Sequence, residues 1–240
     1  MDTGGLSMDF KISFGTSCMG RLHHLKKTYV KNISAALQYD PTCQFVLLDW
    51  NSSDGLDEWV NSSLSKYIDE GIVKYLKTNT RYPLQFSQSI TKNITCKNGD
   101  GDIVCVLDAD NFLGKDFLPI LTRFFTQHKE GFPLLSGGGN KGTAGRMACF
   151  KEHFLQLRGF DESMRGWGAE DDDFESRFKN FFPSAVCRKL KGSALGRAIE
   201  HTGRQTNERS RNQAISRANL KNNIFVPNPK EWGVIPSDSS

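Results

Sequence analysis

Four consecutive acids, Glu170 to Asp173, stand directly behind the tripeptide Gly166-Trp167-Gly168. Neighbouring carboxylates repel one another unless they stay solvated or face a cation. The same crowding can raise the pKa of one of them into the range that a general base needs. This stretch is therefore the first candidate for chemistry in the chain.

A structural explanation of the same segment competes with the chemical one. Phe174, Phe178 and Phe181 follow at helical spacing, so the acids could form the first turn of a helix, where the helix dipole favours negative charge. Trp167 could equally be a core residue, because tryptophan is often buried. A helix start accounts for one or two of the acids but leaves the Gly-Trp-Gly sequence unexplained.

A second pair of acids, Asp108 and Asp110, follows the aliphatic run from Asp102 to Leu107. Such a run is typical of a parallel strand that is buried on both faces. Ligands of open α/β sheets bind at the carboxyl ends of the strands, where these acids would emerge. Paired carboxylates at that edge suit a hard divalent cation that is bound together with phosphate.

The elements that must position these acids alternate between strand and helix, which predicts an α/β fold with a doubly wound sheet. We expect a single domain over residues 1–225, an extended tail over 226–240, and a glycine-rich loop over 131–145. The predicted strands lie at 10–14, 44–49, 72–76 and 102–108, and the predicted helices at 21–39, 55–68, 83–97 and 115–128.

Composition excludes several classes of protein. With 240 residues, 38% of them hydrophobic, and a net charge of +4, the chain can bury the core of a soluble domain. No apolar run is long enough for a membrane span, and the first 20 residues lack the pattern of a secretion signal, so we expect a cytoplasmic protein. The six cysteines lack the spacing of a zinc site or disulfide framework, and no aromatic-interleaved basic stripe indicates nucleic-acid binding.

The motifs taken together resemble those of GT-A-fold, family-2-like glycosyltransferases. The resemblance is carried by Asp49 to Gly55, by Asp108-Ala109-Asp110, and by the block from Phe154 to Asp173. The last block is most similar to the catalytic half of β-1,4-galactosyltransferases and chondroitin-type polymerases. The resemblance implies a mixed, mostly parallel central sheet flanked by helices, and transfer of a sugar from a nucleotide donor, with UDP-sugar the expected donor.

The resemblance also implies roles for individual residues. Lys92 would lie near the donor diphosphate, and Trp50 replaces the second acid of the usual nucleoside motif. The implied donor-binding residues are Thr16, Arg21, Asp49, Asn51, Lys92, Asn93, Asp108, Ala109, Trp167 and Gly168.

A metal site and a catalytic base follow from the same resemblance. Asp110 and His201 would bind Mn²⁺ or Mg²⁺, with Asp108 on the same ion or on the ribose. Asp171 would be the general base that deprotonates the acceptor hydroxyl and gives inversion, while Glu170 orients the acceptor. The galactosyltransferase group has a further metal ligand three residues before the histidine, where this chain has Ala198.

Two other functions share part of this pattern. A sugar nucleotidyltransferase has the same sheet and metal acids, but should carry an Arg-containing, Gly-rich loop after its first strand, which residues 14–20 match poorly. A non-catalytic carbohydrate-binding module would keep Trp167 without needing Asp171. The donor sugar, the oligomeric state and the acceptor stay open, and the acceptor could be a glycan, a lipid-linked intermediate, a protein or a nucleic-acid base.

Overall fold

The protein is built on a five-stranded central sheet with the strand order β3-β2-β1-β4-β7. The computed structural model describes residues 10–78, 85–129, 131–136, 141–143, 145–200 and 207–236. Four of the strands are parallel, and β7 is antiparallel to β4. The strands are β1 (Ile12–Cys18), β2 (Gln44–Asp49), β3 (Val73–Lys77), β4 (Ile103–Val106) and β7 (Ala148–Phe150).

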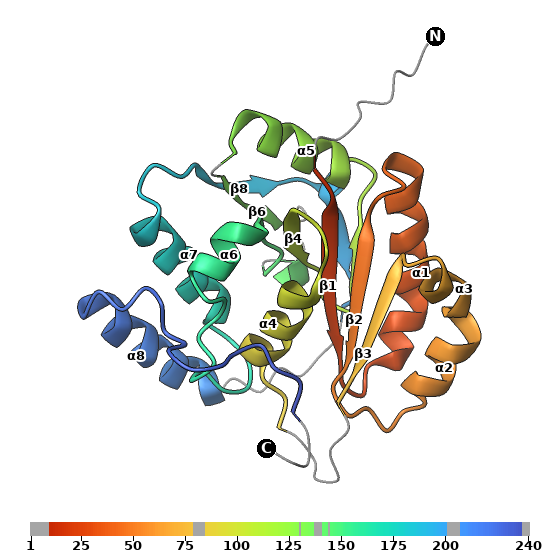
Figure 1. The fold of residues 1–240 in the computed structure, drawn as a ribbon, viewed down its shortest axis with the longest axis horizontal. Helices are drawn as coiled ribbons and strands as arrows, with labels where there is room; N and C mark the ends of the chain where they lie inside the picture. The colour runs from red at the N-terminus through yellow and green to blue at the C-terminus, as the bar shows by residue number, and fades with distance from the viewer. Residues whose placement is uncertain are drawn as a thin grey trace.

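Helices cover both faces of this sheet (Figure 1). One face carries α1 (Leu22–Tyr39), α2 (Leu56–Ser63) and α3 (Ser65–Asp69). The other carries α4 (Gln88–Asn98), α6 (Lys151–Gln156) and α7 (Glu170–Phe181). The remaining helices are α5 (Phe117–Gln127) and α8 (Asn207–Lys221).

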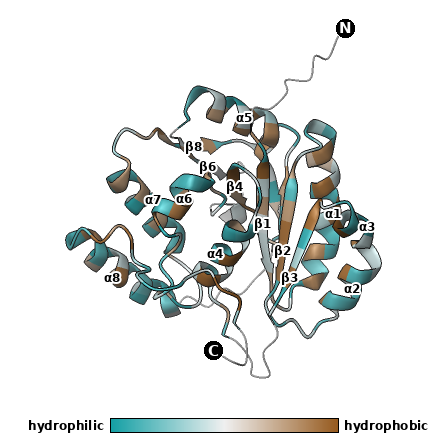
Figure 2. Ribbon diagram, in the orientation of Figure 1, coloured by the Kyte–Doolittle hydropathy of each residue, from teal (hydrophilic) through white to brown (hydrophobic). Residues whose placement is uncertain are grey.

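Successive side chains of a strand point to opposite faces of the sheet, so the hydrophobic core is divided into clusters on its two faces. Phe14 and Phe45 stack at 4.9 Å between ring centroids within the cluster that includes α1, whereas Val104 and Val106 join the cluster of α6 and α7. Figure 2 shows the hydrophobic strands enclosed by helices that carry hydrophilic residues on their outer sides. The three-layer α/β architecture predicted from the sequence is confirmed, because both faces of the sheet needed cover.

Most element boundaries follow the predicted periodicities. The predicted helix over 55–68 is wrong in one respect, because the chain breaks at Leu64 into the two helices α2 and α3. The helix expected over 83–97 begins at Gln88, because the Ser87 side chain accepts a hydrogen bond from the Ile90 amide and caps it. Residues 79–84, which include Pro83, lie outside the described residues.

The prediction of a loop over residues 131–145 is wrong for its first part. Phe132–Ser136 forms β6, which pairs in parallel with β8 (Cys187–Lys191). Phe132 anchors β6 against α7, since it is fully buried and its ring stacks on that of Phe178 with 4.7 Å between the centroids. A further antiparallel pair joins β5 (Asn111–Leu113) to β9 (Gly196–Ala198).

The segment expected as a tail packs against the domain. Residues 224–236 contain no helix or strand, but Trp232 is 6% exposed and belongs to the core cluster of α6 and α7. Lys97 of α4 donates to the Trp232 carbonyl at 2.7 Å, and the Gly233 amide donates to Glu162 at 2.8 Å. This C-terminal stretch is therefore part of the folded body. Within the described chain, no helix combines the length and apolarity that crossing a bilayer requires.

Candidate active site

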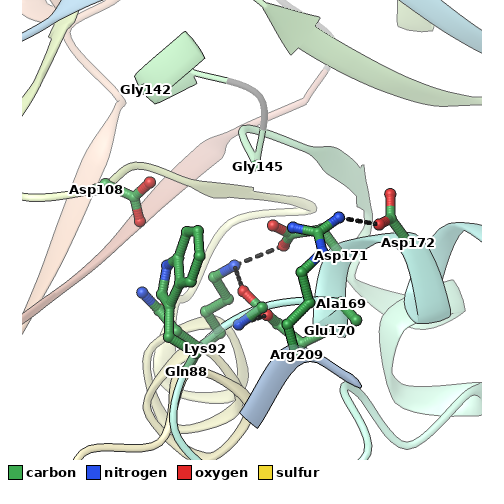
Figure 3. A pocket seen from close by; sticks show the side chains of 12 residues that line it. Gln88, Lys92, Asp108, Gly142, Gly145, Ala169, Glu170, Asp171, Asp172 and Arg209 are labelled. Carbon is green, nitrogen blue, oxygen red and sulfur yellow. Dashed lines mark hydrogen bonds and ion pairs between the residues drawn. The ribbon is translucent and has the colours of Figure 1, made fainter. Parts of the chain in front are cut away.

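Segments from both halves of the chain meet at a cavity of about 210 Å³ (Figure 3). Its walls come from α4, the carboxyl end of β4, Gly142 and Gly145, the segment before α7 with the start of that helix, and α8. The lining residues are Gln88, Lys92, Asp108, Gly142, Gly145, Trp167, Gly168, Ala169, Glu170, Asp171, Asp172 and Arg209. The cavity thus brings Asp108 together with the acids of the Gly-Trp-Gly segment, as the sequence predicts.

Lys92 ties the two halves together at the wall of the cavity. Its ammonium group lies 2.9 Å from Glu170 Oε1 and 2.5 Å from Asp171 Oδ1, and its side chain is 5% exposed. It also stands over the ring of Phe160, 5.2 Å from the centroid. Burial alone would lower the pKa of Lys92, but the charges of Asp171 and Glu170 raise it well above its usual value. Lys92 is therefore a fixed cation between two acids.

The environment of the two acids shifts their pKa values in opposite directions. Burial would raise the pKa of Glu170, but the charge of Lys92 and the hydrogen bonds from Lys92 and the Gly168 amide hold it below its usual value. For Asp171, burial outweighs the stabilising charge of Lys92, and repulsion from Glu170 adds to it, so its pKa is raised to about 7. Asp171 thus has the pKa of a group that exchanges protons near neutrality.

Gly145 lets Asp171 reach this position. A Cβ atom at residue 145 would lie 2.5 Å from Asp171 Oδ2, so any larger residue there would displace the carboxylate. The glycine-rich segment therefore packs closely against the acidic turn.

The Gly-Trp-Gly segment is held in a defined conformation. Gly166 and Gly168 have φ values of 64° and 103°, in the left-handed region that favours glycine. The Gln88 amide donates to the Gly166 carbonyl at 3.0 Å, and Asn212 of α8 donates to the Gly168 carbonyl at 2.9 Å. The half-buried Trp167 is thereby fixed at the cavity wall between α4 and α8.

The acids do occupy the first turn of a helix, so the helical explanation of their spacing is correct as well. It accounts best for Asp173, which is fully buried and paired with Arg177 at 2.7 Å within α7. Asp172 is exposed and pairs with Arg209 of α8 at 3.3 Å. One helix turn therefore serves both the fold, through Asp173, and the cavity, through Glu170 to Asp172.

The predicted metal residues are partly within the described structure. Asp108 faces the cavity, while Asp110 accepts a hydrogen bond from the Asn111 side chain at 2.6 Å. His201 lies outside the described residues, but β9 runs toward it and the Ile199 amide donates to the Asp110 carbonyl at 2.8 Å. In the part of the chain that the structure describes, no three His, Cys, Asp or Glu side chains form a metal-binding group by themselves.

The chemistry around Asp108 nevertheless suits a cation. Burial raises the pKa of Asp108; the charge of Lys92 lowers it, while Asp110 and Glu170 raise it further. A divalent ion near Asp108 would relieve this mutual repulsion of the carboxylates and favour their ionised forms. The donor set of Asp108 and Asp110 therefore fits Mn²⁺ or Mg²⁺, provided that other oxygen or nitrogen ligands complete the shell.

The residues predicted to bind the nucleoside lie at the carboxyl edge of β1 and β2, away from the cavity wall. Asp49 is buried and accepts hydrogen bonds from the Ser52 amide at 2.7 Å and the Tyr75 hydroxyl at 3.2 Å. Arg21 is exposed just before α1, and Asn51 has a left-handed backbone with φ of 53°. These residues thus lie at the edge of the sheet that is expected for the base, and they are not among the residues that line the cavity.

Three of the predicted donor-binding residues make hydrogen bonds within the protein. The Thr16 hydroxyl is buried and donates to the Leu107 carbonyl at 2.8 Å, joining β1 to β4. The Asn93 side chain is fully buried and bonds both the amide and the carbonyl of Phe160. The Ala109 carbonyl accepts from the Thr28 hydroxyl at 2.7 Å. In this structure these contacts hold the scaffold around the site.

Sequence reasoning missed several cavity residues. Gln88 begins α4 and lines the cavity, and its Oε1 atom is buried without a hydrogen-bond partner in the protein. Arg209 enters from α8, and Gly142 and Gly145 from the glycine-rich segment. The sequence feature that indicates Gln88 is its position one helical turn before Lys92, on the same face of the predicted helix.

Comparisons with known proteins agree with this architecture. Residues 136–185 match the family model described as the N-terminal domain of galactosyltransferase. No curated protein sequence matches the chain. The matched segment includes the block from Phe154 to Asp173, which carried the galactosyltransferase-like part of the sequence resemblance.

Solved structures share the fold at low sequence identity. Residues 1–349 of TarS from S. aureus superpose with a TM-score of 0.61 and 16% identity, over 79% of this chain and 60% of that one. The mannosyltransferase PcManGT from Pyrobaculum calidifontis, in complex with GDP-Man and Mn²⁺, superposes with a TM-score of 0.61 and 14% identity, over 91% of this chain and 72% of that one. GalNAc-T7 with UDP, GalNAc and Mn²⁺ superposes with a TM-score of 0.58 and 14% identity, over 82% of this chain and 45% of that one.

The chain spans about 60% of the length of the TarS structure that it matches. The identities are low, so these similarities establish the fold, and the matched segment adds a link to galactosyltransferases at the acidic turn. Together they confirm the resemblance to the GT-A-fold glycosyltransferases and support an enzyme of that class.

Proposed function

We propose that the protein is a metal-dependent, inverting glycosyltransferase that moves a sugar from a nucleotide-diphosphate donor to an acceptor hydroxyl. The observation that carries this proposal is that Asp108 and Asp171, which lie far apart in the sequence, line the same cavity. Lys92 lines that cavity with them and contacts Asp171. Transfer of a glycosyl group builds negative charge on the leaving phosphate and needs a base at the acceptor. The cavity offers a carboxylate for each task.

Asp108 and Asp110, with His201 from outside the described residues, would hold Mn²⁺ or Mg²⁺. When bound, such an ion would neutralise the charge that develops on the departing diphosphate. GDP-Man and Mn²⁺ in the PcManGT structure, and UDP and Mn²⁺ in the GalNAc-T7 structure, support this combination of ligands. We infer a UDP-sugar donor, which the TarS complexes with UDP and UDP-GlcNAc also favour.

Asp171 takes the proton of the acceptor hydroxyl as that oxygen attacks the anomeric carbon from the face opposite the leaving phosphate, which inverts the configuration there. Lys92 holds the carboxylate in place through its 2.5 Å contact, and Gly145 leaves the space that it occupies. Glu170 is 4% exposed and bonds both Lys92 and the Gly168 amide. We therefore assign Glu170 to positioning Lys92 and the loop, in place of the acceptor contact expected from the sequence.

A screen of nucleotide sugars with Mn²⁺ and without acceptor tests this proposal. We expect slow release of a nucleoside diphosphate from one donor, and loss of that release when EDTA removes the metal and return when Mn²⁺ is restored. Release of pyrophosphate from a nucleoside triphosphate and a sugar phosphate would instead identify a nucleotidyltransferase. Binding of a sugar with neither release would identify a carbohydrate-binding module.

The pH dependence of the reaction should report Asp171. Because a base must be deprotonated to work, kcat/KM should fall as the pH drops below about 7, the pKa to which burial raises Asp171. The charge of Lys92 lowers that pKa, so Lys92→Gln should move the acidic limb to higher pH. Initial rates of transfer at subsaturating substrate between pH 5 and 9, about two units on either side of that pKa, locate the acidic limb in the wild type and in Lys92→Gln.

The exposed Lys179, which pairs with Glu175 on α7, provides the matched control. Lys179→Gln removes the same charge without touching the cavity and should leave the limb where it is. An acidic limb that stays in place in Lys92→Gln, while circular dichroism shows a folded protein, would exclude Asp171 as the titrating base.

A further inference from the structure

The side chains of the cavity are ordered from one side to the other. In Figure 3, Asp108 lies on one side, the Lys92–Asp171 contact in the middle, and Asp172 with Arg209 on the far side. In the proposed reaction, the leaving phosphate lies at Asp108 and the base is Asp171. An attacking oxygen must approach the sugar from the side opposite the leaving group, so the acceptor enters past Asp172 and Arg209.

Arg209 is held at this entrance by its helix. Asn212, one turn further along α8, donates to the carbonyls of Arg165 at 3.0 Å and Gly168 at 2.9 Å. Arg209 itself packs closely on the loop, because a Cβ atom at Gly168 would lie only 3.2 Å from the Arg209 Cβ. The backbone and the first carbons of the Arg209 side chain are thereby fixed next to the loop by contacts that do not involve the guanidinium.

The present partner of Arg209 is one that a ligand can replace. The pair between Arg209 Nη2 and Asp172 Oδ2 spans 3.3 Å, and the two side chains are 44% and 67% exposed. Exposed pairs of this kind contribute little to stability, so exchanging Asp172 for another anion costs little. Two further arginines are exposed in the neighbouring chain segments: Arg211 on α8, which pairs with Glu208 at 3.5 Å, and Arg165, whose backbone carbonyl accepts a hydrogen bond from Asn212. Arg209 is the member of this group that lines the cavity.

We propose that Arg209 is a specificity-determining residue that binds an anionic group, a carboxylate or a phosphate, on the acceptor. The guanidinium binds planar or tetrahedral oxyanions through two parallel hydrogen bonds, which a neutral sugar hydroxyl cannot accept as strongly. On binding, the acceptor's anion takes the place of Asp172 on Arg209. Asp172 is then released to accept a hydrogen bond from an acceptor hydroxyl beside the base. This inference rests on the proposed glycosyltransferase function.

Matched acceptors test it in the wild type and in Arg209→Gln, Arg209→Lys and Arg211→Gln. The probes are p-nitrophenyl β-glucoside against its glucuronide, the same pair in the galacto series, and glucose against glucose 6-phosphate. Transfer gives KM and kcat for each acceptor. Ligand-observed NMR gives binding without turnover, and release of nucleoside diphosphate without acceptor gives the state of the donor site.

We expect the wild type to have a KM for the acidic member of at least one pair that is about tenfold lower than for the neutral member, the effect of one charge-assisted hydrogen bond. Arg209→Gln should remove that preference, so that the KM values of the acidic and neutral members become similar. Arg209→Lys should keep part of it, and Arg211→Gln all of it. Comparison of the glucuronide pairs with the glucose 6-phosphate pair shows whether Arg209 recognises a carboxylate or a phosphate.

Equal use and binding of acidic and neutral acceptors by the wild type would overturn the proposal. So would weaker UDP binding in Arg209→Gln, because it would place the guanidinium on the donor diphosphate. Failure of the wild type to release nucleoside diphosphate from any donor refutes the proposed function instead. In that case the NMR comparison still decides whether Arg209 selects acidic sugars.

Discussion

Replacing Asp171 with asparagine should lower sugar transfer by about 10²- to 10⁴-fold, the usual contribution of a positioned general base. Asparagine has the same shape and cannot accept the proton, while the Lys92–Glu170 contact at 2.9 Å remains to hold the wall of the cavity. Binding of the nucleotide should change little, because its phosphates are expected on the side of Asp108. Transfer rates, together with calorimetric titration of UDP and Mn²⁺, measure the two effects separately.

A distant carboxylate gives the control for this variant. Asp69, at the end of α3, is exposed and does not line the cavity, so Asp69→Asn should retain full activity. If Asp171→Asn transfers sugar at a nearly normal rate, another group removes the acceptor proton and the assignment of the base is wrong.

Asp173→Asn should destabilise the fold by about 3–5 kcal/mol, because it leaves the buried guanidinium of Arg177 without its counter-charge. Both side chains are fully buried and meet at 2.7 Å within α7. Arg177 also donates to the carbonyls of Gly159 and Phe225, which keeps it from turning toward solvent. The free energy of unfolding in urea, followed by circular dichroism, measures the loss.

The Lys179–Glu175 pair on the same helix, whose lysine is exposed, provides a comparison of equal spacing. Lys179→Gln breaks this contact and should cost less than about 1 kcal/mol, because the lysine is exposed and Lys189 remains 3.5 Å from the Glu175 carboxylate. The double variant Asp173→Leu with Arg177→Met should recover part of the loss of Asp173→Asn, because no unpaired charge remains. Recovery should be incomplete, since two carbonyls lose their donor. A loss in Asp173→Asn as small as that in Lys179→Gln would show that the buried pair is not important for stability.

The sequence was sufficient to predict the elements that depend on local pattern. The strand over 44–49 and the helix that begins near Arg21 were found within one residue, because hydrophobic residues repeat along them with clear periods. The position of Asp108 at the end of a buried strand followed from the same reasoning. Likewise, the acids of the Gly-Trp-Gly segment were found because no simple packing explanation covers all of them.

The parts that could not be predicted depend on contacts between distant residues. Lys92 and Glu170 are 78 positions apart, and the resemblance, which placed Lys92 near the donor diphosphate, did not indicate the ion pairs that hold it. Likewise β6 was mistaken for loop, because the glycines that follow it outweighed the hydrophobic character of Phe132. Its partner β8 lies about 50 residues further on, beyond the reach of local pattern.

The parallel pairing of β6 and β8 fastens the two ends of a long stretch of chain to each other. The chain leaves β6 at Ser136 and returns at Cys187, and the two strands pair from Phe132–Cys187 to Ser136–Lys191. Within that stretch, β7 is bonded to β4 of the central sheet, and the acidic turn follows it. A change of length must therefore be absorbed in the segments before or after β7, which carry residues of the cavity wall. The shape of the cavity can thus change while both strand pairings keep their register.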